Sequence, residues 1–233
     1  MVPPASPATT VAGVIDEMQA IAAVLPAADG VACFNRMYLE VTEQVQADIS
    51  HGTFGDPTWL AALDVTFANL YFAAVGAAAA GPAANIPAAW QPLFEARSNP
   101  AITSIQFALA GMNAHINHDL PIALVQTCRE LGTAPDAGTY HADYQKVDGL
   151  LDAAEQSARQ SFESGAEVAA DKRLQGVLDL VGNWSINSAR DVAWDTGQAL
   201  WMCRDITSAE DLMMSALART VAMASRCLLV AIA

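Results

Sequence analysis

Residues 104–126 read SIQFALAGMNAHINHDLPIALVQ, in which a polar cluster lies between two apolar runs. The apolar runs SIQFALA and IALVQ are typical of a buried helix, so the polar residues lie within an otherwise buried element. Pro121 interrupts that helix, because its ring has no N–H to donate to the carbonyl of Asn117 four residues back. We predict a helix over residues 101–131 with an interruption near Pro121.

Helical periodicity continues on both sides of this stretch. Asp29 and Asp56 are suited to cap the helices that follow them, and Thr207 with Glu210 forms a capping-box pattern for the last helix. Gly and Pro mark the ends of several segments. The further predicted helices cover residues 10–24, 30–49, 57 to about 80, 85 to about 98, 139 to about 162, 167–204 and 207 to the C-terminus.

The pattern as a whole predicts one helical domain. No alternating strand, hairpin signal or repeat of fixed period occurs in the sequence. Hydrophobic residues make up 53% of the chain and charged residues 15%, which is a composition that supports a large core. We predict an all-α, single-domain bundle of seven or eight helices enclosing a pocket over residues 10–233, with a disordered proline-rich segment at 1–9.

The net charge and the composition of the chain limit the classes of partner and the cellular location that we expect. A net charge of -14 repels phosphate backbones and anionic lipid surfaces, so we expect no nucleic-acid and no membrane partner. The first ten residues lack the basic and apolar regions of a secretory signal, and the longest apolar run is rich in Ala and contains Gly and Pro. The four cysteines lie far apart, which favours reduced thiols in a cytoplasmic protein. A homodimer is left open.

The polar cluster contains the residue types of acid/base chemistry. His115 and Asp119 form an i, i+4 pair on one helix face, and Asn113 with Asn117 forms a second pair beside them. Burying such groups without partners costs about 1–3 kcal/mol each, so they require a hydrogen-bond network, a metal or a pocket. The structural alternative is that Asp119 caps the following helix and His115 is a core histidine, while His118 is expected to face solvent.

Other segments supply candidates for the surroundings of this cluster. Asp64, Phe67 and Tyr71 share one stripe of a predicted helix, where a buried Asp64 would have a raised pKa and could act as a general acid. The alternative is an exposed Asp64. Tyr144 can reach the cluster, and Trp194 belongs to an aromatic stripe that forms either core or a ligand-binding wall.

Three further residues have simpler interpretations. Arg190 can pair with a buried carboxylate, which would satisfy both charges. His141 and Asp143 are expected on the solvated face of their helix.

Known catalytic and metal motifs are absent from the sequence. There is no HExxH, GxGxxG, Walker loop, GxSxG or CxxCH pattern, so we expect no cofactor and assign no metal ligand. His115 and Asp119 could supply two metal ligands, but a site needs a third, and Asp64, His141, Asp143 and Asp148 are not at diagnostic spacing. A metal-dependent hydrolase remains an alternative.

The segment GMNAHINHDLP resembles the G-M-N-A-H-I-N-x-D-L-P signature of an all-helical, largely uncharacterised family common in actinobacteria. LDVTFANLY, HADYQKVDGLLD and ARDVAW at 189–194 are also similar to segments of that family, so the resemblance covers about residues 30–205. Some members resemble cofactor-independent cyclases that close spiroketals on polyketides. The resemblance implies roles for Asn113, His115, Asn117, Asp119 and Pro121, whereas His118 falls at the variable position.

These observations lead to one functional hypothesis and two alternatives. The hypothesis is a cofactor-independent enzyme that cyclises an apolar small molecule, with His115 and Asp119 exchanging the proton and Asn113 and Asn117 holding oxygen atoms. The substrate-contacting residues would be Asp64, Phe67, Tyr71, Tyr144 and Trp194. The alternatives are the metal-dependent hydrolase and a non-catalytic binding or structural protein.

Overall fold

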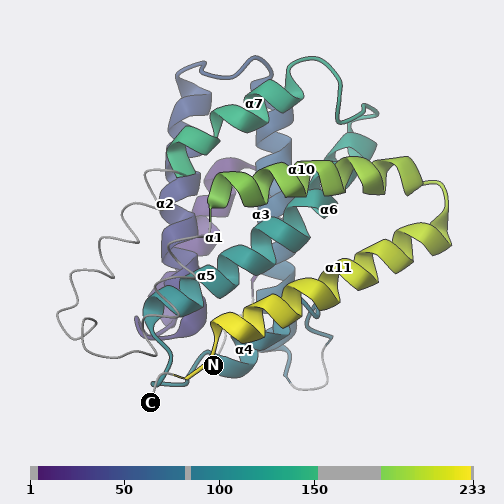
Figure 1. Cartoon of the computed structure of the whole chain (residues 1–233). Helices are drawn as coiled ribbons and strands as arrows, with labels where there is room; N and C mark the ends of the chain where they lie inside the picture. The colour runs from purple at the N-terminus through teal and green to yellow at the C-terminus, as the bar shows by residue number, and fades with distance from the viewer. Residues whose placement is uncertain (1–4, 82–84, 152–184, 232–233) are drawn as a thin grey trace.

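The computed structural model describes residues 5–81, 85–151 and 185–231, which are helical and contain no strand (Figure 1). The all-α bundle predicted from the sequence is confirmed within these residues. The segments are α1 (Val11–Val24), α2 (Gly30–Ser50), α3 (Pro57–Ala79), α4 (Gln91–Ala96), α5 (Ser104–Ala114), the π-helix η1 (His115–Asp119), α6 (Leu120–Glu130), α7 (Tyr140–Lys146), α10 (Ile186–Cys203) and α11 (Thr207–Leu228).

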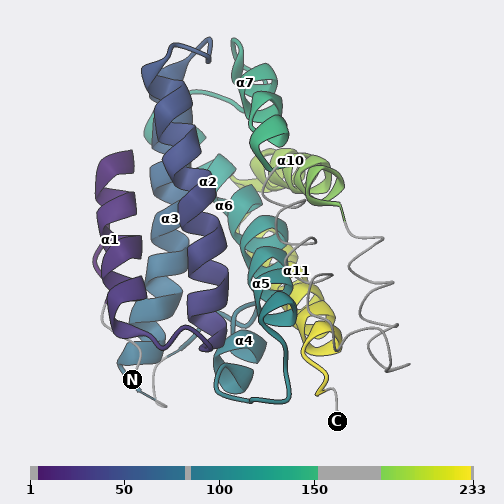
Figure 2. The same ribbon diagram turned by 90° about the vertical axis from the view of Figure 1, so that its left-hand side faces the viewer.

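The helices form three layers (Figure 2). α1, α2 and α3 lie side by side in the first layer, and α5, η1 and α6 run end to end as one rod through the middle. α10 packs on α6 and α11 packs on α5, which makes these two helices the third layer. The rod that contains the polar cluster is therefore covered on both sides, in agreement with its apolar ends.

Helix starts follow the capping chemistry of the sequence in part. The predicted caps are confirmed, since the Asp29 side chain accepts a hydrogen bond from Val31 N and that of Asp56 accepts one from Trp59 N. The capping box predicted at Thr207 is wrong, because Ile206 occupies the N-cap position of α11 without a side-chain bond. A capping box occurs instead at Thr103, at the start of α5.

The central rod is continuous through the predicted interruption. At η1 the Leu120 N–H donates to the carbonyl of His115, five residues back, so one π-helical turn joins α5 to α6. Pro121 then lies in the first turn of α6, where its missing N–H costs least. The proline thus changes the hydrogen-bonding pattern within the polar cluster without ending the rod.

Residues 5–8, which belong to the segment predicted to be disordered, form hydrogen bonds with two helices. Ala8 N donates to Asn69 Oδ1 at 2.7 Å, and Asn69 Nδ2 donates back to Ala8 O at 2.9 Å. Ser6 N also donates to Glu17. Residues 5–8 are thereby attached to α1 and α3, while residues 1–4 lie outside the described residues, as do 152–184 of the helices predicted over 139–162 and 167–204.

α3 is the one described helix that is long and apolar enough to cross a membrane by length and composition. In the structure it packs against α6 and α1 and buries Trp59, Leu60 and Leu63. A core helix passes the same test of length and composition, so this single helix is weak grounds for a membrane span.

Candidate functional site

The carboxylate of Asp119 accepts three side-chain hydrogen bonds. Oδ2 lies 3.0 Å from His115 Nδ1 and 2.9 Å from Trp90 Nε1, and Oδ1 lies 2.7 Å from His118 Nδ1. The residue is only 2% exposed. One buried carboxylate thus joins two imidazoles and an indole, and the carboxylate is the centre of the polar cluster.

The donors around Asp119 determine its charge. Burial by itself raises the pKa of this carboxyl, but the hydrogen bonds from His115 and His118 outweigh burial and hold the pKa below its ordinary value. Burial lowers the pKa of His115, and the bond to Asp119 offsets only part of that effect. Asp119 is therefore ionised beside a neutral His115, whose Nδ1–H donates to the carboxylate and whose Nε2 is left as an acceptor.

The structure contradicts one prediction about the cluster, the exposure of His118, and does not support the alternative in which the Asp119 side chain caps α6. His118 is buried against Asp119 instead of facing solvent. Asp119 does not cap α6 through its side chain, because the carboxylate oxygens are directed to the imidazoles and the indole. The π-helical turn brings both histidines to one carboxylate, so the cluster is a hydrogen-bond network.

Aromatic rings hold the His115 imidazole in place. Phe67 is stacked on it with ring centroids 3.5 Å apart and an interplanar angle of 6°, and Tyr38 packs at 4.4 Å. Phe34 contacts the ring edge-on at 5.6 Å. With Nδ1 bonded to Asp119 and the ring clamped by its neighbours, Nε2 has a fixed direction.

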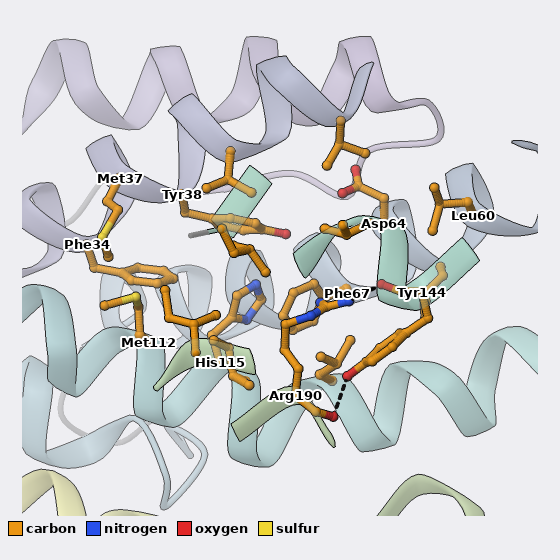
Figure 3. A pocket seen from close by; sticks show the side chains of 18 residues that line it. Phe34, Met37, Tyr38, Leu60, Asp64, Phe67, Met112, His115, Tyr144 and Arg190 are labelled. Atoms are coloured by element: carbon orange, nitrogen blue, oxygen red, sulfur yellow. Dashed lines mark hydrogen bonds between the residues drawn. The ribbon is translucent and has the colours of Figure 1, made fainter. Parts of the chain in front are cut away.

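His115 forms part of the wall of a cavity that lies mainly between α2, α3, η1 and α10 (Figure 3). Its volume is about 790 Å³, the opening to solvent included. Most of the wall is aliphatic or aromatic, with Met37, Val45, Leu60 and Met112 as examples. A wall of this character suits a small, largely apolar molecule.

Three buried polar atoms on this wall have no hydrogen-bond partner: His115 Nε2, Tyr38 Oη and Asp64 Oδ2. Burial raises the pKa of the Asp64 carboxyl to about 7, so much of it carries a proton near neutral pH. Burial, and then the charges of Asp64 and Asp119, place the pKa of Tyr38 well above its ordinary value. The cavity therefore presents an acceptor on His115 and donors on Tyr38 and Asp64.

Arg190 forms the cavity wall together with Tyr144. Its Nε donates to Asp148 Oδ1 at 2.6 Å, so the predicted pairing with a carboxylate is confirmed, but this carboxylate is 21% exposed and not buried as predicted. Its Nη2 donates to Tyr144 O at 2.6 Å, and Tyr144 Oη donates to Arg190 O at 2.7 Å. The guanidinium also lies 3.9 Å from the centroid of the Tyr144 ring. At this end of the cavity the Arg190 charge is therefore paired with Asp148, and Arg190 and Tyr144 are joined by two hydrogen bonds.

The structure separates the sequence-predicted residues into two groups. Asp64, Phe67, Tyr144 and His115 line the cavity, and Asp119 lies directly behind His115.

Four other predicted residues do not line the cavity. Asn113 Nδ2 donates to Val221 O and Ser225 Oγ of α11, and Asn117 donates to Asn113, so this pair fixes helix packing. Holding substrate oxygens is therefore not a role that their position allows. Tyr71 donates to Asn35 and packs behind His115, and Trp194 lies against Tyr144 in the core.

Asp143 is also placed differently from the prediction. It is fully buried and accepts hydrogen bonds from Gly55 N, Asp56 N, Thr139 and Lys146. Burial opposes ionisation, yet these bonds lower the pKa to about 2. The residue fastens α7 to the start of α3 and has no access to the cavity.

Sequence reasoning missed Tyr38 and Trp90. Tyr38 lies on the apolar face of α2 between Phe34 and Val41, where a tyrosine is typical of the core. Nothing in the neighbouring sequence distinguishes its hydroxyl from that of a core tyrosine. Trp90 precedes the short α4 and is far from Asp119 in sequence. The one available signal was a single hydroxyl on an otherwise apolar face.

A metal site has little support from the residues present. Within 5–81, 85–151 and 185–231, no three His, Cys, Asp or Glu side chains are arranged to hold a metal ion. His115 and Asp119 bind each other through Nδ1 and Oδ2 and do not converge on a common point.

The chain belongs to the family of unknown function DUF5995, whose sequence model matches residues 11–231. No curated protein and no solved structure matches the chain.

Proposed function

We propose that this member of a family of unknown function is a cofactor-independent acid/base enzyme that cyclises an apolar small molecule with loss of water. The observation that supports this most is the set of three unpartnered polar atoms, on His115, Tyr38 and Asp64, in the wall of one largely apolar cavity. Leaving buried polar groups unpaired costs about 1–3 kcal/mol each, so a ligand that pairs with them is strongly favoured.

Spiroketal formation from a dihydroxyketone fits these groups. One hydroxyl adds to the ketone to give a hemiketal, and Asp64 donates its proton to the hemiketal oxygen, which leaves as water. The second hydroxyl attacks the resulting oxocarbenium carbon while His115 Nε2 accepts its proton. Addition of the first hydroxyl forms one C–O bond at the expense of the C=O π bond; from the hemiketal onward one C–O bond breaks, one forms, and one water is released. The proton on His115 then returns to Asp64 through exchange with water.

Asp119 and the aromatic rings prepare the base for this step. The ionised carboxylate stabilises the imidazolium that forms, and it fixes the tautomer in which Nε2 is the acceptor. The Tyr38 hydroxyl can donate to the departing or attacking oxygen. The cavity wall holds a flexible chain in one folded conformation, which lowers the entropic part of the barrier.

The resemblance to polyketide spiroketal cyclases supports the same reaction class. It leads us to propose a polyketide substrate in natural-product biosynthesis. All four cysteines are free, which is compatible with the cytoplasmic location that we propose.

The test is turnover of a synthetic aliphatic dihydroxyketone, followed by chiral gas chromatography. The protein should give one spiroketal enantiomer in excess over the racemic background reaction. His115→Gln and Asp64→Asn should each lower the rate by about a hundredfold, the range expected for loss of a general base or acid. Tyr140 lies on α7 with its ring stacked on Trp59, and it does not line the cavity. Tyr140→Phe removes only its hydroxyl and should keep full activity.

Two outcomes would favour the alternatives. Stoichiometric metal in the purified protein, with hydrolase activity lost on chelation, would support a metal-dependent hydrolase. Binding of apolar ligands without any conversion, and with His115→Gln affecting stability alone, would support a non-catalytic binding protein.

A further inference from the structure

We infer that the cavity selects an uncharged, elongated ligand with a hydroxyl and a carbonyl oxygen on a hydrocarbon chain, and that it rejects carboxylates. This inference rests on the proposed function, because the ligand is its substrate. It follows from three features of the wall: the donor and acceptor roles of its free atoms, the state of its cation, and its length.

The free atoms require both a donor and an acceptor on the ligand. His115 uses its Nδ1–H on Asp119, so Nε2 can only accept, and a ligand hydroxyl is the simplest group that donates to it. Asp64 Oδ2 and Tyr38 Oη belong to α3 and α2, opposite η1; near neutral pH Tyr38 bears its proton, and Asp64, whose pKa is about 7, bears one in part of the molecules. A carbonyl oxygen satisfies one or both of them. Figure 3 shows the Tyr38 hydroxyl drawn between the His115 imidazole and the Asp64 carboxyl.

The cation in the wall is already neutralised. Arg190 directs Nε to Asp148 Oδ1 and Nη2 to Tyr144 O, and it is 5% exposed. Among the described residues that line the cavity there is no other Lys or Arg. A carboxylate ligand would have to lose water against a largely apolar wall whose described residues offer it no free positive partner, which is unfavourable. Asp64 would add repulsion wherever it is ionised.

The length of the wall indicates an extended ligand. The cavity residues on α2 run from Phe34 to Val45, eleven positions, which is about 16 Å of helix at 1.5 Å per residue. Met37 and Met112 lie at the end near Phe34, far from Arg190 in Figure 3. Methionine side chains adapt to ligand shape, so this end suits a hydrocarbon tail, with the oxygen functions beside His115 and Asp64.

Isothermal titration calorimetry with three probes tests the inference: methyl octyl ketone, its γ-hydroxy derivative, and decanoate. At pH 7 the γ-hydroxy derivative should bind at least about threefold tighter than the ketone, the gain from one additional hydrogen bond. Decanoate should bind at least about tenfold more weakly than either, because its charge has no free partner. Decanoate binding as tightly as the ketone, or no binding by any probe, would overturn the inference.

Variants assign the preference to the named atoms. Tyr38→Phe and Asp64→Asn probe the carbonyl contact; the first should weaken the ketone about threefold, and the second should preserve binding, since an amide still donates. His115→Phe should remove the advantage of the hydroxyl derivative over the ketone. Tyr140→Phe, outside the cavity, should change none of these values. If the Arg190→Met variant binds decanoate less well than the wild type, the cation recruits carboxylates and the inference is wrong.

These results are separable from the proposed function. Selective binding of the neutral hydroxyketone without turnover of the dihydroxyketone would leave the ligand class standing and remove the cyclase. Turnover accompanied by equal binding of decanoate would do the reverse.

Discussion

Asp119 is shared between two imidazoles that differ in access to the cavity. His115 lines it, whereas His118 does not, and the two are joined only through the carboxylate oxygens. Because Asp119 also accepts a hydrogen bond from His118, its carboxylate stabilises a protonated His115 less than it would alone. We therefore expect His118 to be a positioning residue whose charge lowers the pKa of the base.

Replacing His118 by Gln should raise the pKa of His115. Burial is the main cause of the low pKa of His115, Asp119 opposes it, and the charge of His118 adds to the lowering. The substitution removes that charge while an amide N–H can still donate to Asp119. Ring ¹⁵N chemical shifts of His115, followed by NMR across the pH range, measure the change directly. His141→Gln is the control, because His141 stacks on Trp194 away from Asp119. An unchanged or lower pKa would refute the coupling.

Asp64→Asn should change how stability depends on pH. The folded pKa of Asp64 is raised from 3.8 to about 7, so between these values the unfolded chain ionises the carboxyl while the folded one retains its proton. The folded state then binds more protons, and the wild type loses stability as pH rises through this window. Asn removes the effect. At pH 8 the variant should be more stable by about 1 kcal/mol, discounted for the partial exposure of the side chain.

Urea denaturation at pH 4 and pH 8 measures this difference. The gain of the variant should be present at pH 8 and nearly absent at pH 4. Equal gains at both values would mean that Asp64 is ionised in the folded protein and does not serve as the acid.

At the scale of residues, the sequence predicted those parts of the site in which the side chains belong to one helix and lie three or four positions apart. His115 with Asp119, and Asp64 with Phe67, are each three or four residues apart, and helical spacing indicated both pairs. Asn113 shows the limit: its helix face was predictable, but its partner Ser225 is more than a hundred residues away. Tyr38 was missed for the same reason, because only tertiary packing separates a cavity hydroxyl from a core ring.

At the scale of elements, the rod of α5, η1 and α6 determines where the base lies. The proline predicted an irregularity at the right place, but a proline alone does not distinguish a kink from a π turn. The choice depends on the bonds made by Asp119, which involve Trp90 outside the rod. The position of the irregularity was therefore predictable from sequence and its geometry was not.

Gly111→Ala should destabilise the protein although alanine favours helices. A Cβ at Gly111 would lie 2.6 Å from Phe34 Cβ and closer to its ring, where α2 crosses α5. Helix propensity gains about 1 kcal/mol, while forcing a methyl into a packed contact costs about 1–3 kcal/mol. We expect a net loss of stability and, because Phe34 packs on His115 and lines the cavity, weaker ligand binding.

Gly76→Ala in α3 is the matched control for this substitution. Its Cβ would meet only Ala5 O at 3.7 Å, an ordinary contact, so the variant should be about 0.5–1 kcal/mol more stable than the wild type. Chemical denaturation of both variants decides the matter. A stabilised Gly111→Ala would show that α2 and α5 have room to separate.

At the scale of the molecule, the sequence predicted the class of fold and not the arrangement of its layers. The apolar periodicity was strong enough to place α1, α2 and α3 within a few residues. Which helices enclose the cavity depends on contacts between segments far apart in the chain, such as α2 with α5 and α10 with α6. The pocket was expected and four of its wall residues were among the candidates, but the rest of the wall could not be assigned from one sequence.

A ligand that fills the cavity should stabilise the whole fold, because the wall draws residues from all three layers. At a concentration about a hundred times its dissociation constant, linkage predicts about 2.7 kcal/mol of stabilisation. For a chain of this size that corresponds to a rise in Tm of roughly 5–10 °C. Differential scanning fluorimetry with the γ-hydroxy derivative of methyl octyl ketone measures the rise.

Val41→Phe should abolish this rise, because a larger side chain at a lining position on α2 occupies the space that the ligand needs. Val192→Phe adds the same ring to an exposed position of α10 and should leave the rise intact. Because both variants carry an added phenyl group, a general effect of hydrophobic substitution would affect both. A full rise in Val41→Phe would place the ligand outside this cavity, and the roles assigned to His115, Tyr38 and Asp64 would fail with it.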